Sequence, residues 1–307
     1  MQRYLNYNDI LKREFSTRVQ KISVNAGFTC PNRDGSKGIG GCTYCNNQSF
    51  SPGYAKPVKS VRQQLDEGIS FFSHKAKYQS QLYLAYFQSY TNTYDKLENL
   101  VKIYEEALMH PKVAGIIVGT RPDCINDALL DYFAELSRSY YVMIEYGIES
   151  TNNDTLDFIN RGHTYEEAKE AILKTASKGL RTGAHLILGL PNEDREMILS
   201  HAEKISILPL TTLKLHQLQL VKGTKMARQY AEYPELFRLF TVEEYIELVV
   251  DFIERIHPDI AIERFVSQSP YKLLIAPDWG LKNFEFVHKI EKCLEERDTW
   301  QGKLVKN

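Results

Sequence analysis

Short apolar runs alternate with longer amphipathic segments along most of the chain. The runs AGIIVG at 114–119 and AHLILG at 184–189 are almost continuously apolar, which is typical of parallel strands covered by helices. Strands are predicted at 21–25, 81–88, 113–119, 141–147, 182–189 and 213–220. A shorter run at 259–266 predicts a seventh strand or an edge strand.

The amphipathic segments predict helices with recognisable ends. Residues 61–72 and 95–110 repeat apolar side chains at helical spacing. Thr164 and Thr241 are each followed three residues later by glutamate, which is the capping-box pattern of a helix start. Gly179 stands where a helix-terminating glycine is expected. A final helix is predicted over about 285–297.

Six strand–helix units predict an α/β fold, a partial (β/α)6 barrel of the TIM type with a C-terminal α/β extension. An open, doubly wound sheet is the alternative. We expect residues 1–17 to form an N-terminal extension, 18–222 the barrel, and 223–307 an extension packed on it. Barrel enzymes place their ligand groups at the C-terminal ends of the strands, so residues that follow each strand are candidates.

Composition and charge narrow the class of protein. The 307 residues are 43% hydrophobic and 25% charged, which excludes a disordered chain, a collagen-like fibre and a small disulfide scaffold. A net charge of −1 excludes a bulk polyanion binder but not a local basic groove for RNA. No apolar run reaches the roughly 20 residues of a membrane helix, and the first residues lack a signal-peptide pattern. We therefore expect a cytoplasmic protein with reduced thiols and no membrane partner.

Three of the five cysteines follow the first predicted strand. Eleven residues separate Cys30 from Cys42, two separate Cys42 from Cys45, and the glycine-rich stretch 35–41 can wrap closely around a ligand. They could be three unrelated buried cysteines. A structural zinc site needs four ligands, but this segment holds one Cys-x-x-Cys pair and no histidine. Three thiolates with one position open fit a 4Fe–4S cluster whose fourth iron binds something else.

These motifs resemble those of a known family. CPNRDG at 30–35 and GGCTYC at 40–45 are similar to the widely spaced cysteine motif of the Elongator catalytic subunit. They match better the YhcC-like subfamily of the radical S-adenosylmethionine (SAM) superfamily. The resemblance continues through YFQSYTNTY, GTRPDC, EYGIES, HLILGLPNED and the late TWQG. The superfamily's usual spacing, with three residues between the first two cysteines, is not matched.

The resemblance implies a chemistry for the three cysteines. Cys30, Cys42 and Cys45 would hold a 4Fe–4S cluster whose open iron binds SAM. Reduction by a donor such as flavodoxin or ferredoxin would cleave SAM to a 5′-deoxyadenosyl radical, which abstracts hydrogen from the substrate. The resemblance leaves the substrate undefined, either an RNA or a small molecule.

It also implies residues that contact SAM. Tyr44 matches the aromatic residue that lies near the adenine in this family, or else packs beneath the loop. After the second strand, Gln88, Thr91 and Asn92 stand in place of the family's glycine-rich turn and offer polar groups. These residues could equally form an ordinary polar loop.

The third and fourth strands contribute further candidates. Arg121 offers a fork of donors for a carboxylate or phosphate, or pairs with Asp123 as a structural lock. By resemblance, Glu145 and Ser150 contact SAM, and Glu149 lies nearer the substrate. Alternatively, Glu145 pairs with an arginine of the barrel. Cys124 is expected to be a small buried residue.

On the fifth strand, His185, Ile187 and Gly189 fall on the family's adenine-side motif, with His185 replacing its first glycine. A histidine in an apolar strand can also be a satisfied core residue. On the sixth strand, Lys214 and His216 share one face by alternation, which presents polar groups to the barrel mouth.

Two other classes of protein stay open. One is a non-catalytic carrier that binds an Fe–S cluster, SAM or haem, although no axial haem ligands stand out. The other is a zinc-stabilised RNA-binding module, which predicts a clustered basic surface. The extension, which includes Arg264, Trp279 and Trp300, either closes the barrel bottom or roofs the substrate, and its aromatic residues could instead belong to the core.

Overall fold

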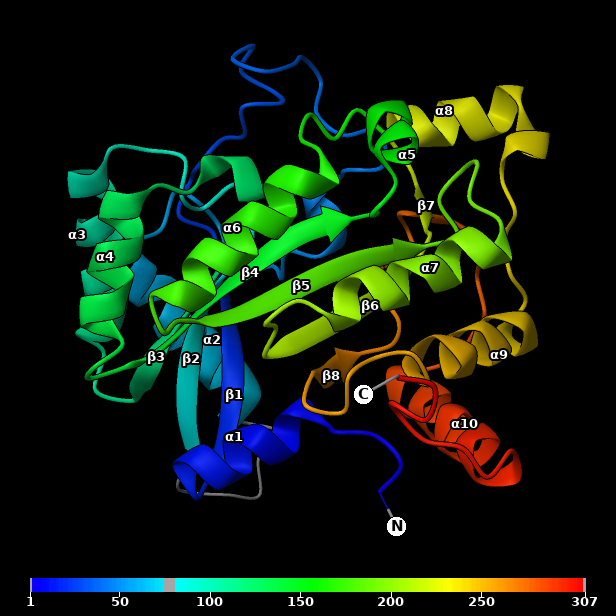
Figure 1. Ribbon diagram of the computed structural model, residues 1–307. Coiled ribbons are helices and arrows are strands. Elements are labelled where there is room, and N and C mark those ends of the chain that lie inside the picture. Colours follow the sequence, from blue (N-terminus) through cyan, green and yellow to red (C-terminus); the bar gives the residue numbers. More distant parts are fainter. Residues whose placement is uncertain (1, 74–80, 306–307) are drawn as a thin grey trace.

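The computed structural model describes residues 2–73 and 81–305, and its centre is a curled parallel sheet with helices on the outside (Figure 1). The seven strands of this sheet pair in the order β1-β2-β3-β4-β5-β6-β8. They are β1 (Arg18–Val24), β2 (Gln81–Phe87), β3 (Val113–Thr120), β4 (Tyr141–Glu149), β5 (Arg181–Leu188), β6 (Thr212–Gln217) and β8 (Ala261–Arg264). The order follows the chain without the reversal that a doubly wound sheet requires, so the predicted partial barrel is confirmed and the alternative is wrong.

Three boundaries of the six predicted strands differ from the sequence prediction by more than one residue, and the first is the start of β1, which lies at Arg18 instead of residue 21. β4 continues to Glu149: all nine of its residues are buried, and its pairing with β5 resumes at Glu149 after a register shift that follows Gly147. β6 ends at Gln217, where the chain leaves the sheet, and Leu220–Val221 form β7 beside β9 (Leu274–Ala276) in a separate antiparallel pair. The run at 259–266 supplies β8, the seventh strand and one edge of the sheet.

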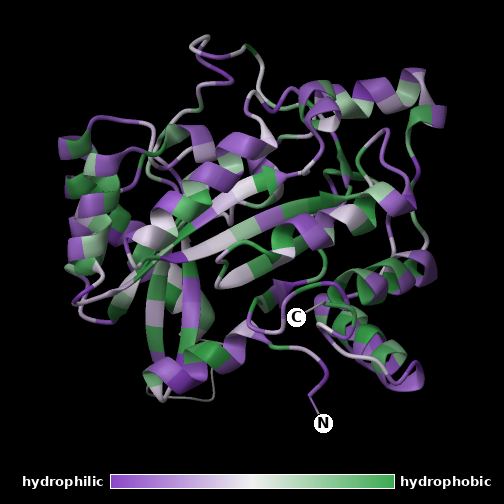
Figure 2. Ribbon diagram, viewed as in Figure 1, coloured by the Kyte–Doolittle hydropathy of each residue, from purple (hydrophilic) through white to green (hydrophobic). Residues whose placement is uncertain are grey.

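Most of the helices cover the outer face of the sheet, whereas α1 lies across one end of it, α8 lies beside β7 and α10 packs on α9 (Figures 1 and 2). They are α1 (Tyr7–Phe15), α2 (Val61–Ser73), α3 (Leu97–Leu108), α4 (Asp127–Leu136), α5 (Asn153–Phe158), α6 (Tyr165–Ser177), α7 (Arg195–Ser206), α8 (Lys225–Glu232), α9 (Val242–Ile253) and α10 (Asn283–Glu296). The predicted capping boxes at Thr164 and Thr241 are confirmed, and Gly179 adopts φ +74° after α6. None of the helices in the described part of the chain could span a membrane.

The two ends of the chain meet below the barrel. α1 places Tyr7 and Leu11 in a buried cluster with strand residues, and the Tyr7 and Tyr141 hydroxyls are 2.8 Å apart. Gln301, from the TWQG stretch, donates to the carbonyls of His257 and Ile260 at 2.8 Å, and its side-chain oxygen accepts from Leu5 N. This end of the barrel is therefore closed, and the opposite end, where the strands finish, is left for a site.

The aromatic residues of the extension divide between the core and the surface. Trp279 is partly buried and stacks on Phe286 with ring centroids 5.4 Å apart, and it contacts Tyr245, so it packs against the core beside α9 and α10. Trp300 is 47% exposed and Tyr271 is 81% exposed. Of these aromatic residues, Trp279 therefore packs with the core, as one of the two alternatives predicted.

Because β3 packs closely against β4, we expect one methyl group added at Gly115 to lower the stability of the protein strongly. A Cβ added to Gly115 would lie 2.0 Å from the Tyr141 carbonyl oxygen, which is backbone and cannot rotate away. We expect Gly115→Ala to lower the free energy of unfolding by about 1–3 kcal/mol or more, measured by urea denaturation. Gly53→Ala is the matched control, because nothing lies within 4 Å of its added Cβ. Equal stability of the two variants would contradict this packing.

Candidate active site

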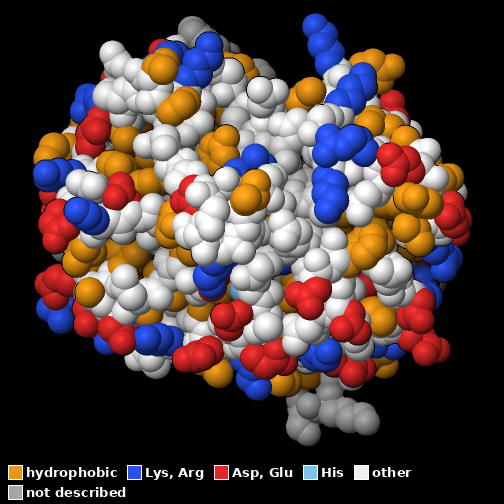
Figure 3. All heavy atoms as spheres, turned by 90° about the horizontal axis from the view of Figure 1, so that it is seen from above, with side chains coloured by type: hydrophobic (Ala, Val, Ile, Leu, Met, Phe, Trp, Pro, Cys, Tyr) orange, Lys and Arg blue, Asp and Glu red, His pale blue; other side chains and the backbone are white. Residues whose placement is uncertain are grey.

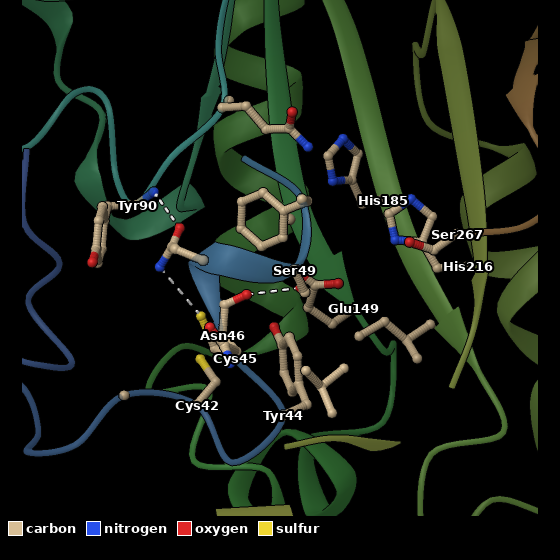
Figure 4. A pocket seen from close by; sticks show the side chains of 18 of the residues that line it. Cys42, Tyr44, Cys45, Asn46, Ser49, Tyr90, Glu149, His185, His216 and Ser267 are labelled. Atoms are coloured by element: carbon tan, nitrogen blue, oxygen red, sulfur yellow. Dashed lines mark hydrogen bonds between the residues drawn. The ribbon is translucent and has the colours of Figure 1, made fainter. Parts of the chain in front are cut away.

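The loop after β1 carries the three cysteines into a pocket at the C-terminal ends of the strands (Figure 4). Cys30 and Cys42 are buried, and Cys45 is partly exposed. Burial raises the pKa of the Cys45 thiol to about 11, and the neighbouring Cys42 adds to this. Without a bound metal, Cys45 is therefore a neutral thiol at neutral pH. Metal binding would displace its proton.

Backbone hydrogen bonds fold the cysteine loop back on itself. Gly41 N donates to the Asn32 carbonyl at 2.7 Å, and Thr43 N donates to the Ile159 carbonyl at 2.9 Å. Gly41 has φ +82°, and a Cβ there would lie 2.9 Å from the Arg33 side chain. The backbone angle at this position therefore favours glycine, and an added Cβ would also displace the Arg33 side chain.

Nitrogen donors point at two of the sulfur atoms. Arg161 Nη1 and Asn32 Nδ2 each lie 3.6 Å from Cys42 Sγ, and Asn47 Nδ2 lies 3.7 Å from Cys45 Sγ. Such donors stabilise thiolates and tune the potential of a cluster bound to them. Arg161 Nε is also buried without a hydrogen-bond partner. Thiols with donors at their sulfurs and an unsatisfied guanidinium atom beside them fit a thiolate-ligated cluster.

The spacing of the cysteines bears on which metal group could fit. Among the described residues, no three His, Cys, Asp or Glu side chains are arranged to hold one metal ion. In a four-iron cluster each cysteine binds a different iron, so its ligands stand farther apart than the ligands of a single zinc ion.

Most of the residues predicted to contact SAM line the same pocket. Those that do are Tyr44, Gln88, Thr91, Arg121, Glu145, His185 and Ile187. Thr91 Oγ1 is buried without a hydrogen-bond partner. Figure 4 shows Tyr44 and Glu149 between the cysteines on one side and His185 and His216 on the other.

Three other predicted residues lie outside the pocket lining. Asn92 donates from its side chain to the carbonyls of Phe87 and Gly119 at 3.1 and 2.8 Å, which ties β2 to β3. Ser150 donates to Glu193 at 2.5 Å, and Gly189 adopts φ +90°. Each of the three supports a loop next to the pocket, and their contacts with SAM stay predictions.

Arg121 forms the structural lock that was the alternative to ligand binding. Its Nε and Nη2 lie 2.9 Å from the two oxygens of Asp123, and its Nη1 donates to the Arg161 carbonyl at 2.7 Å. Burial raises the pKa of Asp123, but Arg121 and Lys37 outweigh it and lower that pKa to about 2. Cys124 is partly buried beside Asp123, and burial raises the pKa of its thiol to about 12.

Glu145 lies in the middle of β4, and its partners are lysines and a histidine rather than the arginine of the alternative interpretation. Lys214 Nζ is 2.7 Å from Glu145 Oε1, and Lys21 Nζ is 3.4 Å from it. His185 Nε2 donates to Glu145 Oε2 at 3.0 Å. Burial raises the pKa of Glu145, but Lys214 and Lys21 overcome this and hold it well below its usual range. The carboxylate is therefore charged and already paired.

Several residues of the pocket had not been singled out from the sequence. Arg161 comes from the loop after α5, in a polar stretch that looks like any surface loop. It lies 3.6 Å from Glu149 and donates to the Gly147 carbonyl at 2.5 Å. Arg264, which the sequence assigned to the extension, lies on β8 and lines the pocket. Glu263, the adjacent charge in the apolar run at 259–266, had not been singled out and lies outside the pocket lining.

Comparisons with known proteins relate the chain to one superfamily. Residues 27–205 match the family model described as the radical SAM superfamily, and residues 210–296 match that of the radical SAM C-terminal domain. The chain is 35% identical to YtqA of Bacillus subtilis over 303 residues, which is 99% of this chain and 93% of YtqA. It is 33% identical to YhcC of Escherichia coli over 309 residues, which is 99% of this chain and 96% of YhcC.

A solved structure extends the comparison to the fold. Archaeal Elp3 of Methanocaldococcus infernus, lacking residues 1–46, superposes with a TM-score of 0.69 at 14% identity. The match covers 93% of this chain and 64% of the Elp3 chain. At this identity the likeness concerns the fold alone.

The buried charges predict a large loss of stability when one partner is removed. We expect Lys214→Met to lower the free energy of unfolding by about 3–5 kcal/mol, because Glu145 then lies buried without its nearest cation. Urea denaturation at neutral pH measures the loss. The double variant Lys214→Met/Glu145→Gln removes both charges and should recover part of it.

A matched surface variant completes this test. Lys178→Met removes an exposed pair with Asp131 and should leave stability nearly unchanged. If Lys214→Met were as mild as Lys178→Met, the barrel interior would not depend on this charge pair.

Proposed function

The chain belongs to the radical SAM superfamily, and we propose that it is an enzyme that uses a 4Fe–4S cluster and SAM to abstract hydrogen from a substrate. The observation that carries the proposal is the set of three cysteines at one wall of the pocket, two of them with nitrogen donors at their sulfurs. When bound, the cluster and SAM together would supply the 5′-deoxyadenosyl radical. Cys30, Cys42 and Cys45 are the proposed cluster ligands.

Polar groups around the pocket would orient SAM. Thr91 Oγ1 has no partner within the described chain, so it is free to bond a ligand hydroxyl or ammonium. Gln88 lies beside it at the end of β2, and Ile187 offers an apolar surface from β5. Burial raises the pKa of Tyr44 well above its usual range, and the nearby Glu149 adds to this, so its hydroxyl stays protonated. Fixed groups of this kind hold a reacting molecule in one orientation.

The cluster would be reduced from outside the pocket. We propose a donor such as flavodoxin or ferredoxin, which would approach the cysteine loop where Cys45 is partly exposed. Figure 3 looks down on this end of the barrel, where Lys and Arg side chains gather in the upper part of the view and Asp and Glu in the lower part. A face with both signs of charge is not the continuous basic surface that an RNA-binding module would present.

The first test is metal binding. We expect anaerobic reconstitution to load one 4Fe–4S cluster per chain, and the triple variant Cys30→Ala/Cys42→Ala/Cys45→Ala to lose it. Iron and sulfide per chain, with the broad visible absorbance of an Fe–S cluster, give the result. Cys124→Ala and Cys293→Ala are the controls and should keep the cluster. Full iron content in the triple variant, or a colourless zinc-loaded protein, would contradict the assignment.

The second test is SAM cleavage. The reconstituted protein, reduced with dithionite, should convert SAM slowly to methionine and 5′-deoxyadenosine even without substrate. Chromatography of the products measures both. A protein that binds SAM and leaves it intact would be a carrier, and one that forms S-adenosylhomocysteine alone would be an ordinary methyltransferase.

A further inference from the structure

A β-bulge at the edge of the sheet turns two charged residues toward the inside of the barrel. Leu213 pairs with Ile262, and the next residue of β6, Lys214, pairs with Arg264, so Glu263 is an extra residue in β8. Bulges of this kind re-aim side chains and are common beside active sites. Here Glu263 contacts Lys214 at 3.1 Å, and Arg264 lines the pocket together with His216.

The charge of Arg264 is not compensated within the protein. Lys21 and Lys214 are matched by Glu145 and Glu263, so the group of four charges below the pocket is neutral. Among the described residues, Arg264 has no hydrogen bond and no ion pair, although it is partly buried. The other arginines of the pocket each have a partner: Arg33 the Cys45 carbonyl, Arg121 Asp123, and Arg161 the Gly147 carbonyl.

A second unsatisfied donor lies next to this guanidinium. His216 is two residues beyond Lys214 on the same face of β6, and its Nε2 is buried without a hydrogen-bond partner. Burial lowers the pKa of His216 well below its usual range, and Arg264 lowers it further, so the ring is neutral and can carry its proton on Nε2. The neighbouring Gln217 is already bonded to the backbone of Ser267.

We propose that Arg264 and His216 form a subsite for an anionic group of the substrate, a carboxylate or a phosphate. The guanidinium fork fits two oxygens of such a group, and the imidazole donates to it. Figure 4 places His216 across the pocket from Cys42 and Cys45, so an anion held there would extend the substrate toward the cysteines. This inference rests on the proposed function for its account of what the anion belongs to, but the subsite itself does not require the cluster.

The experiment measures anion binding directly. Isothermal titration of the full chain, with inorganic phosphate in one arm and acetate in the other, should give saturable binding of at least one anion. The anion that binds more tightly indicates whether the substrate carries a phosphate or a carboxylate. Arg264→Gln should weaken that binding about ten- to a hundred-fold, the usual effect of losing a charged hydrogen bond. Arg264→Lys keeps the charge without the fork and should give an intermediate affinity.

Two controls make the result decisive. Arg238 is exposed and does not line the pocket, so the Arg238→Gln variant should bind the anion as the unchanged protein does. Thermal melting of each variant shows whether it is folded. Binding that is unchanged in a folded Arg264→Gln, or absent for both anions in the unchanged protein, would overturn the proposal.

A competition titration separates the substrate from the cofactor, since SAM itself carries a carboxylate. In the reconstituted protein, saturating SAM should change the affinity for the anion by less than about threefold, because the two occupy different walls of the pocket. Displacement of the anion by SAM would assign Arg264 to the cofactor and overturn the proposal. If the cluster fails to load, the titration without it still reports on the subsite, so failure of the proposed function and failure of this inference are distinguishable.

Discussion

A buried carboxylate between two lysines is the interaction on which the barrel depends. Glu145 on β4 is bonded by Lys214 from β6, Lys21 from β1 and His185 from β5, and Glu263 of β8 joins through the same lysines. β1 and β8 are the two edges of the open sheet and are not hydrogen-bonded neighbours. Charges this deeply buried are tolerated only when paired, so moving either edge away would strand a charge. The network therefore helps to fix the curl of the sheet, whose edge strands β1 and β8 are not joined by hydrogen bonds.

The same network divides the interior of the barrel into levels. Below it, the tyrosines and apolar side chains of α1 and the strands fill the closed end. Above it, the pocket begins, with the cysteine loop on one wall and β6 and β8 on the other. Glu145 and His185 belong to the network and also line the pocket, so the network forms its floor. The partners of Glu145 therefore affect the shape and charge of the pocket as well as the stability of the barrel.

The sequence was sufficient to locate the helices and strands and to predict that three cysteines lie together at the ends of the strands, but it did not predict the contacts between side chains. Apolar runs and capping boxes located the strands and helices because local preferences and tertiary packing agree there. The end of β4 was missed, because glycine and glutamate within EYGIES are the residues that usually end a strand. The partners of Glu145 and the position of Arg264 depend on the register of β6 with β8, including its bulge, and register is set by contacts between distant segments. No pattern along the chain carries that information.

The fold of the loop reconciles the wide spacing of Cys30 and Cys42 with the usual spacing of the superfamily. Gly41 N donates to the Asn32 carbonyl, and within the loop Lys37 N and Gly38 N donate to the Pro31 carbonyl. Counted across the first of these hydrogen bonds, Pro31, Asn32 and Gly41 are the residues that stand between Cys30 and Cys42. That is the same number as in the usual radical SAM spacing of three residues.

Residues 33–40 form an excursion that starts and ends at one hydrogen bond. The entropy of closing a loop rises only slowly with its length, so the additional residues cost little. Asn32 also donates to the Arg161 carbonyl at 3.1 Å, which anchors the base of the excursion to the loop after α5 and holds it beside the sulfur of Cys42.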